Sequence, residues 1–206
     1  MRARWAARAL YGTVAAVLLG ACGSDDSGRL AGAVRTPPLV VDTVALPQLA
    51  ADGTRQVAPL RADADELLLV NFGYTFCPDV CPTTMSDLSV ALSDLSDERA
   101  ERVTVAMITV DPERDTDEVL VNYLGHFFDD AIAVRPDDPA QLESAGQVFG
   151  AQWDIADHEP GEQYYEVSHT AITYVVDDTG TVVVEWPFGF TIESMTSDLN
   201  ALLKET

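Results

Sequence analysis

Basic residues are scarce in this chain of 206 residues. It has 12 Lys and Arg against 34 Asp and Glu, which gives a formal net charge of −22 at pH 7. A surface this acidic repels phosphate groups, so binding of nucleic acid or anionic lipid headgroups through the protein surface is excluded. Such a charge instead favours cations, or proteins that present a basic face, as partners.

The chain also lacks an apolar run that would span a bilayer comfortably. Its N-terminal apolar stretch, residues 9–21, follows three arginines and ends in small residues. A basic start, a short apolar segment and small closing residues are typical of a secretory signal. We therefore predict a lipoprotein signal peptide over residues 1–21.

Cysteine is rare as well, with three in the chain. The first of them, Cys22, closes the sequence LGAC, which is similar to a bacterial lipobox, in which the cysteine is lipidated and becomes the new N-terminus. A charged, Gly/Ser-rich segment follows and suits a tether. We predict a lipid on Cys22, a flexible tether over residues 22–37, and a location on the extracytoplasmic face of the cell membrane.

The remaining cysteines, Cys77 and Cys81, have three residues between them. Such a pair can be a structural disulfide, a redox pair or part of a metal site. A bridge across so short a loop would stabilise little, because the entropic gain grows with loop size. Thiol–disulfide oxidoreductases normally place two residues between their cysteines. The spacing favours a metal site and leaves a redox dithiol as the alternative.

The rest of the chain alternates strand and helix patterns. Continuous apolar runs predict strands buried on both faces, and Asp177–Gly180 indicates a hairpin turn. The predicted strands are 67–72, 103–110, 132–134, 171–176 and 182–186, with an extended segment at 40–49. The predicted helices are 83–95, 116–128, 140–149 and 192–203, and 153–166 is predicted as a long loop. This order predicts an α/β domain over residues 38–206, with a central mixed sheet flanked by helices and an added hairpin.

Cys77 and Cys81 fall where a predicted buried strand ends and a helix follows. This is the edge at which open α/β sheets bind ligands. The first cysteine there faces free backbone N–H groups and the positive end of the helix dipole, and both lower the pKa of its thiol. An offset of four positions brings the two sulfurs together if the segment is helical.

His169 is the best candidate for a third ligand. It precedes the predicted strand 171–176, and the start of an antiparallel strand lies beside the C-terminal ends of its parallel neighbours. We therefore expect it at the same edge as the two cysteines. Two thiolates and one imidazole suit Cu(I) best, tolerate Cu(II) and permit Zn(II). His126, in a predicted helix, and His158, in an acidic loop, are expected at the surface.

Two aspartates follow the second buried strand. Asp111 is a candidate to hold the imidazole of His169, or a nearby arginine, in place through a hydrogen bond, and a purely structural role is equally open. Either Asp115 or Thr116 is expected to cap the next helix, with Asp115 favoured, because the sequence DTDE provides a capping residue and acidic groups for its first turn.

Three segments together resemble the Sco/SenC family. They are FGYTFCPDVCPTTM (72–85), VDPERDT (110–116) and SHTAITYVVDDTG (168–180). The likeness covers about residues 38–204 and implies a thioredoxin-like fold. Carried over residue by residue, the family's copper ligands fall on Cys77, Cys81 and His169.

The resemblance also implies a function. Members of the family are membrane-tethered copper proteins that help to assemble the dinuclear copper centre of cytochrome c oxidase. The expected function is therefore a metallochaperone that passes copper to the copper-bearing subunit of the oxidase by ligand exchange. The alternative is a thiol–disulfide oxidoreductase, in which Cys77 and Cys81 are a redox pair that reduces the cysteines of that site or of another exported protein.

Overall fold

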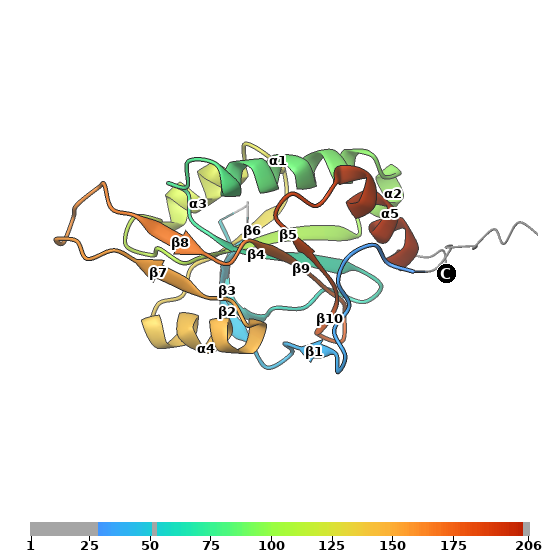
Figure 1. Ribbon diagram of the computed structural model, residues 1–206, viewed down its shortest axis with the longest axis horizontal. Helices are drawn as coiled ribbons and strands as arrows, with labels where there is room; N and C mark the ends of the chain where they lie inside the picture. The colour runs from blue at the N-terminus through green and yellow to red at the C-terminus, as the bar shows by residue number, and fades with distance from the viewer. Residues whose placement is uncertain (1–28, 51–52, 204–206) are drawn as a thin grey trace, which may run out of the picture.

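The computed structural model describes residues 29–50 and 53–203 of the chain, which form a central sheet of eight strands in the order β1-β10-β9-β4-β5-β6-β2-β3 (Figure 1). The sheet strands are β1 (Leu39–Val40), β2 (Ala45–Leu49), β3 (Arg55–Pro59), β4 (Leu67–Gly73), β5 (Val103–Thr109), β6 (Ala131–Val134), β9 (Ile172–Val176) and β10 (Thr181–Pro187). A separate ribbon pairs β7 (Trp153–Ile155) with β8 (Val167–His169). The helices are α1 (Val80–Ser93), α2 (Asp97–Ala100), α3 (Asp117–Leu124), α4 (Pro139–Phe149) and α5 (Ile192–Leu202).

The middle of the sheet is parallel and its flanks are antiparallel. β4 pairs with β5 in parallel from Leu67↔Val103 to Gly73↔Thr109, so the two strands end at the same edge. β9 runs antiparallel to β4 on the other side. Every residue of β4 is buried, as its continuous apolar run predicts. The predicted α/β class with a central mixed sheet is confirmed.

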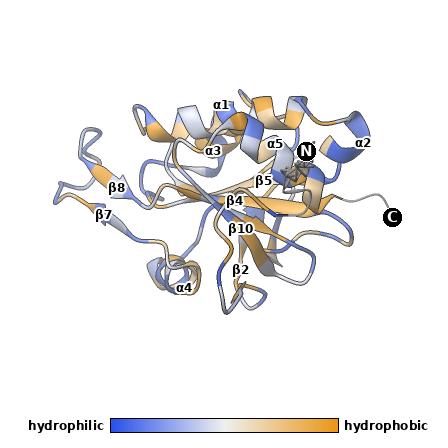
Figure 2. Cartoon of the chain, turned by 45° about the vertical axis from the view of Figure 1, so that its right-hand side comes forward, coloured by the Kyte–Doolittle hydropathy of each residue, from blue (hydrophilic) through white to orange (hydrophobic). Residues whose placement is uncertain are grey.

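Helices cover both faces of the sheet, which explains why its central strands carry no polar face (Figure 2). α1, α3 and α5 pack on one face around Leu69, Met107 and Trp186. α4 packs on the other around Val70 and Phe149. Figure 1 shows α1 and α5 above the sheet and α4 below it. This two-sided burial holds the ends of β4 and β5 rigidly, so the loops that follow these two strands begin at fixed positions.

Two helices begin differently from the prediction. α1 begins at Val80, ahead of the predicted Thr83, so that Cys81 lies in its first turn. α3 begins at Asp117 and is capped by Thr116, whose hydroxyl accepts a hydrogen bond from the backbone N–H of Val119 at 3.3 Å. The prediction that Asp115 caps this helix is therefore wrong.

The segment before β1 lies against the domain. The backbone N–H groups of Ala31 and Gly32 donate to the carboxylate of Asp198 at 2.6 and 3.0 Å, and Ala33 forms an isolated bridge with Glu185. A Cβ on Gly32 would come within 2.4 Å of Val184, so this close approach requires glycine. Residues 31–33, which fall within the predicted tether over 22–37, therefore contact the domain. Cys22 and the signal peptide predicted over 1–21 lie outside the described residues.

The predicted loop 153–166 begins as a strand. β7 pairs antiparallel with β8, from Trp153↔His169 to Ile155↔Val167, and the ribbon projects from the edge of the sheet (Figure 1). Trp153 stacks on Phe72, with ring centroids 6.4 Å apart, so its role is packing. Within the part of the chain that the structure describes, no helix has both the length and the apolar character needed to cross a membrane.

Candidate metal centre

The two cysteines lie in the connection that follows β4. Cys77 is half-buried in the loop of residues 74–79, and Cys81, with 4% of its surface exposed, lies in the first turn of α1. Gly73, the last residue of β4, makes this packing possible, because a Cβ there would lie 2.9 Å from the sulfur of Cys81. Both cysteines are free thiols.

The pairing of strands in the sheet places His169 beside the two cysteines. It ends β8, and β9 follows with Thr173 opposite Asn71 of β4, which brings the preceding residues to the end of β4. Nε2 of His169 lies 3.4 Å from the sulfur of Cys81. The ligand atoms of Cys77, Cys81 and His169 all lie within 4.8 Å of one another. The structure thus brings together the three residues that the sequence singled out.

The imidazole of His169 is oriented for ligation. Its Nδ1 lies 3.0 Å from the carbonyl oxygen of Thr170. A carbonyl only accepts hydrogen bonds, so this contact places a proton on Nδ1 and leaves Nε2 as the ring nitrogen that faces the sulfurs. The ring of Tyr74 packs against the imidazole edge-to-face at 5.8 Å, and its hydroxyl donates to the carbonyl of Val167 at 3.1 Å.

The two thiols have opposite acidities. The hydrogen bond from the Cys81 side chain lowers the pKa of Cys77 to about 4, aided by the backbone N–H groups of Cys81 and Asp79, and partial burial opposes this effect. The Cys81 backbone N–H lies 3.3 Å from the sulfur of Cys77, at the positive end of α1. The hydrogen bond to Cys77 and burial both raise the pKa of Cys81. With these pKa shifts, we expect the reduced, metal-free pair to hold one thiolate and one thiol at neutral pH.

This donor set fits a soft metal ion. Sulfur and imidazole ligands lie about 2.0–2.3 Å from a bound ion, so ligand atoms that lie within 4.8 Å of one another need a shift of at most about 1 Å to share one ion. Two sulfurs and one nitrogen match Cu(I) better than hard cations, which prefer oxygen. Binding would displace the proton of Cys81, because the ligand is the thiolate.

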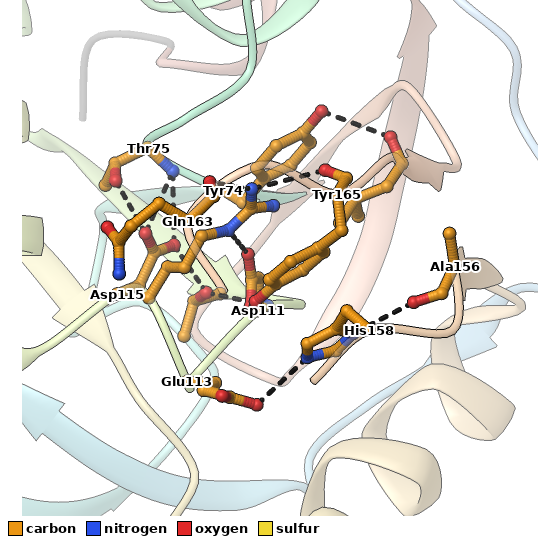
Figure 3. Close-up of polar contacts among 12 residues, drawn as sticks. Tyr74, Thr75, Asp111, Glu113, Asp115, Ala156, His158, Gln163 and Tyr165 are labelled. Atoms are coloured by element: carbon orange, nitrogen blue, oxygen red, sulfur yellow. Dashed lines mark hydrogen bonds and ion pairs between the residues drawn. The ribbon is translucent and has the colours of Figure 1, made fainter. Parts of the chain in front are cut away.

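Asp111 does not support the imidazole. Its carboxylate, 1% exposed, pairs with Nε of Arg114 and accepts a hydrogen bond from the hydroxyl of Tyr165 at 2.7 Å (Figure 3). The group that contacts Nδ1 of His169 is instead the carbonyl oxygen of Thr170. Of the two partners considered for Asp111, the arginine is the one it contacts.

Asp115 connects the cysteine loop to the sheet. It is fully buried, and its carboxylate accepts hydrogen bonds from the backbone N–H and hydroxyl of Thr75 and from the hydroxyl of Thr109 (Figure 3). Thr75 lies two residues before Cys77, and Thr109 ends β5. Asp115 therefore fixes the start of the loop that carries Cys77.

The other two histidines lie apart from this centre. Nδ1 of His126 lies 2.6 Å from the carbonyl of Asn122 at the exposed end of α3. His158 stacks on Tyr165 at 3.7 Å, and its Nε2 lies 3.1 Å from the carboxylate of Glu113. Among the described residues, the group of Cys77, Cys81 and His169 is the one that gathers three metal-ligating side chains.

Sequence reasoning missed two residues that shape the centre. Gly73 makes room for Cys81, and Tyr74 confines the imidazole. Arg114 and Tyr165 join the loops around the centre through a contact that the sequence did not predict. The sequence did contain one signal, a Gly-Tyr pair directly after a buried strand, since glycine there indicates a close approach. The contact between Arg114 and Tyr165 depends on tertiary structure and has no local signal.

The fold and the site define a thioredoxin-like domain with a dithiol–imidazole centre at the edge of its sheet. Residues 60–204 match the family model described as SCO1/SenC. The chain belongs to the SCO1/SenC family.

Individual relatives agree with this assignment. The SCO2-like protein of Rickettsia prowazekii is 32% identical over 114 residues, 55% of each chain, so the chain spans about half the length of the curated relatives it matches. Apo Sco1 from Thermus thermophilus, solved in solution, is 31% identical with a TM-score of 0.69, over 85% of this chain and 98% of its own. Copper-bound ScoI from Bradyrhizobium japonicum is 29% identical with a TM-score of 0.63, over 75% and 95%.

Proposed function

We propose that this chain binds one copper ion through Cys77, Cys81 and His169 and passes it to the copper-bearing subunit of cytochrome c oxidase. The observation that carries the proposal is the convergence of two sulfurs and one imidazole nitrogen within 4.8 Å. The related ScoI from Bradyrhizobium japonicum was solved with copper bound, which supports copper as the ion. The donor set suits Cu(I) and tolerates Cu(II).

The burial of the ligands gives an order for ligand exchange. Cys81 is buried, whereas Cys77 and His169 are partly exposed. A groove between the cysteine loop and the ribbon is lined in part by Phe76 and Ser168, which precede Cys77 and His169 in the chain. An incoming thiolate or imidazole therefore approaches copper from the side of Cys77 and His169, and Cys81 releases the ion last. Three protein ligands leave space for that attack.

A copper titration tests the proposal. In the reduced full chain with Cys22→Ser, which removes the third thiol, we expect one copper ion per chain. His169→Ala should weaken affinity by at least about 100-fold, because losing a group behind a metal ligand already costs about 10–100-fold. It should also shift the thiolate-to-copper absorption of the Cu(II) form, because one donor has changed.

His126→Ala is the matched control, since it removes an imidazole away from the centre and should leave affinity and spectrum unchanged. Oxidation of Cys77 and Cys81 to a disulfide should abolish binding, because a disulfide offers no thiolate. Unchanged affinity and an unchanged spectrum in His169→Ala would refute the three-ligand site.

The thiol–disulfide reductase remains a second candidate, favoured by the thiolate of Cys77 beside the protonated thiol of Cys81. Cys77 would attack a partner's disulfide, and Cys81 would then displace the partner's second thiol as it loses its proton. The two cysteines of this chain end oxidised and the partner reduced. Stoichiometric reduction of a disulfide that survives in His169→Ala, together with weak copper binding by the unmodified chain, would favour this function.

We further propose that a lipid on Cys22 anchors the chain to the extracytoplasmic face of the cell membrane. The acidic surface would not hold it at an anionic bilayer, so the anchor would provide the attachment. When the full chain is expressed with a labelled fatty acid, we expect label in the membrane fraction that is lost in Cys22→Ser. Cys77→Ser is the control and should retain the label. An unlabelled wild-type chain released to the medium would contradict the anchor.

A further inference from the structure

Arg114 lies at the centre of a buried contact between two loops, which we call the Arg114 clasp: Arg114 with Asp111, Gln163 and Tyr165. Its side chain is 5% exposed, and its Nε pairs with the carboxylate of Asp111. Its Nη1 donates to the carbonyl oxygens of Gln163 and Tyr165 at 3.3 and 3.2 Å. The guanidinium lies 3.7 Å above the ring of Tyr165, whose hydroxyl donates to Asp111 (Figure 3).

The same guanidinium also faces the cysteine loop. It lies 5.0 Å from the ring of Phe76, the residue before Cys77, and 5.6 Å from the ring of Tyr74. Tyr74 in turn touches the imidazole of His169 and bonds to the backbone of β8. Arg114 therefore contacts both the loop that carries the cysteines and the loop that leads into the strand carrying His169.

The ribbon that ends in His169 needs such a contact. β7 and β8 are three residues each and pair only with each other. A two-stranded ribbon is marginally stable by itself in water, so tertiary contacts must set its position. The packing of Trp153 holds β7, and the clasp holds the loop that joins the two strands.

Stability alone is a weak reason for the clasp. Arg114 and Asp111 are both buried, and desolvating such an ion pair often offsets its Coulombic gain. What the pair does provide is a fixed orientation of the two loops, because a planar guanidinium donates in fixed directions and stacks on a ring at the same time. A lysine would keep the charge and lose both the forked donation and the stacking.

We propose that Arg114 is a positioning residue for copper binding: the clasp holds the ribbon so that His169 stays opposite Cys77 and Cys81. This inference rests on the copper-binding function proposed above. When the clasp is broken, the dithiol remains in place, and His169 spends less time within reach of the sulfurs.

The test compares Arg114→Lys with Arg55→Lys, in the reduced full chain carrying Cys22→Ser. Arg55 is a matched control because it pairs with Asp117 and Asp137 at the surface, outside the clasp. We expect Arg114→Lys to lower copper affinity by about tenfold or more, the usual effect of losing support behind a ligand. Arg55→Lys should leave it unchanged.

A double-mutant cycle separates positioning from a general loss of structure. In the His169→Ala background, Arg114→Lys should cause no further loss of copper affinity, because the clasp acts through the imidazole. An equal loss in both backgrounds would overturn the proposal. So would an unchanged affinity in the single variant.

Hydrogen exchange of the metal-free chain gives a readout that does not depend on copper. Arg114→Lys should speed amide exchange in β8 by about tenfold or more and leave β4 unchanged, because only the ribbon loses its contact.

If Arg114→Lys does not fold, Tyr165→Phe removes only the hydroxyl bond to Asp111 and should change exchange and affinity in the same direction by a smaller factor. Unchanged exchange in β8 overturns the inference. A wild-type chain that binds no copper refutes the proposed function instead, and exchange still decides whether the clasp positions the ribbon.

Discussion

In the reduced, metal-free chain, iodoacetamide is expected to modify Cys77 at pH 6 at least about 100-fold faster than Cys81, because the thiolate is the nucleophile. Hydrogen bonds lower the pKa of Cys77 to about 4, so this thiol is ionised at pH 6. Burial and the hydrogen bond to Cys77 raise the pKa of Cys81, which stays protonated and 4% exposed. Peptide mapping of the Cys22→Ser chain after brief labelling measures the ratio.

The pH profile gives a sharper signature than the absolute rate. A thiol with the ordinary pKa of 9.0 reacts about tenfold faster per pH unit between pH 5.5 and 7.5, since its thiolate fraction grows by that factor. Cys77 should react at a nearly constant rate over this range. Because its pKa is lowered in the folded protein, the rate should fall only as the pH drops through about 4. A less basic thiolate is also a weaker nucleophile, so the plateau rate itself will be modest.

Unfolding supplies the control. In concentrated urea the helix terminus and the bond from Cys81 are lost, so Cys77 should regain the tenfold dependence per pH unit. A steep pH profile in the folded chain, or labelling of Cys81 before Cys77, would show that Cys77 is not the thiolate of the pair.

The asymmetry of the two thiols serves both candidate functions. A reductase needs an ionised attacking sulfur and a second thiol behind it, and a copper site needs two thiolates. Copper must therefore displace the proton of Cys81, whereas a disulfide is attacked by Cys77 without prior deprotonation. The position of His169 is what distinguishes the two, because only metal binding requires its free Nε2 beside the sulfurs.

Local signals in the sequence were enough to locate the dithiol and the histidine. The buried strand β4 was readable from its unbroken apolar run, and the cysteines follow it directly. Helix α1 begins earlier than predicted because its first turn, with Cys81 and Pro82, lies ahead of the apolar periodicity. The position of His169 followed from strand direction, which depends on topology rather than on detailed packing.

The residue contacts around the metal centre could not be predicted from such local signals. β7 and β8 have three residues each, too few to show alternation, and residues 156–166 separate them. Asp115 was assigned to a helix next to it in sequence, whereas its carboxylate accepts hydrogen bonds from Thr75, which folding brings near. Asp111 pairs with its neighbour Arg114 and, in place of His169, accepts a hydrogen bond from the distant Tyr165. Short-range rules favour local partners, and buried carboxylates take the donors that the tertiary structure supplies.

Asp115→Ala is expected to lower the free energy of unfolding by about 3 kcal/mol, because it leaves the backbone N–H of Thr75 buried without an acceptor and removes bonds to two hydroxyls. Burial raises the pKa of Asp115, and relief of that burial offsets part of the loss. For a domain of this size the melting temperature should fall by about 6–12 °C. Urea unfolding and thermal scans of the reduced chain measure both quantities.

Two further variants make the Asp115 result specific. Asp115→Asn keeps one oxygen acceptor for Thr75 and should lose about 1 kcal/mol, whereas the exposed Asp130→Ala should change stability by less than about 0.5 kcal/mol. Thr75 lies two residues before Cys77, so Asp115→Ala should also release the cysteine loop and weaken copper binding in the folded fraction. A loss below about 1 kcal/mol for Asp115→Ala, with copper affinity intact, would mean that the sheet and α1 alone fix this loop.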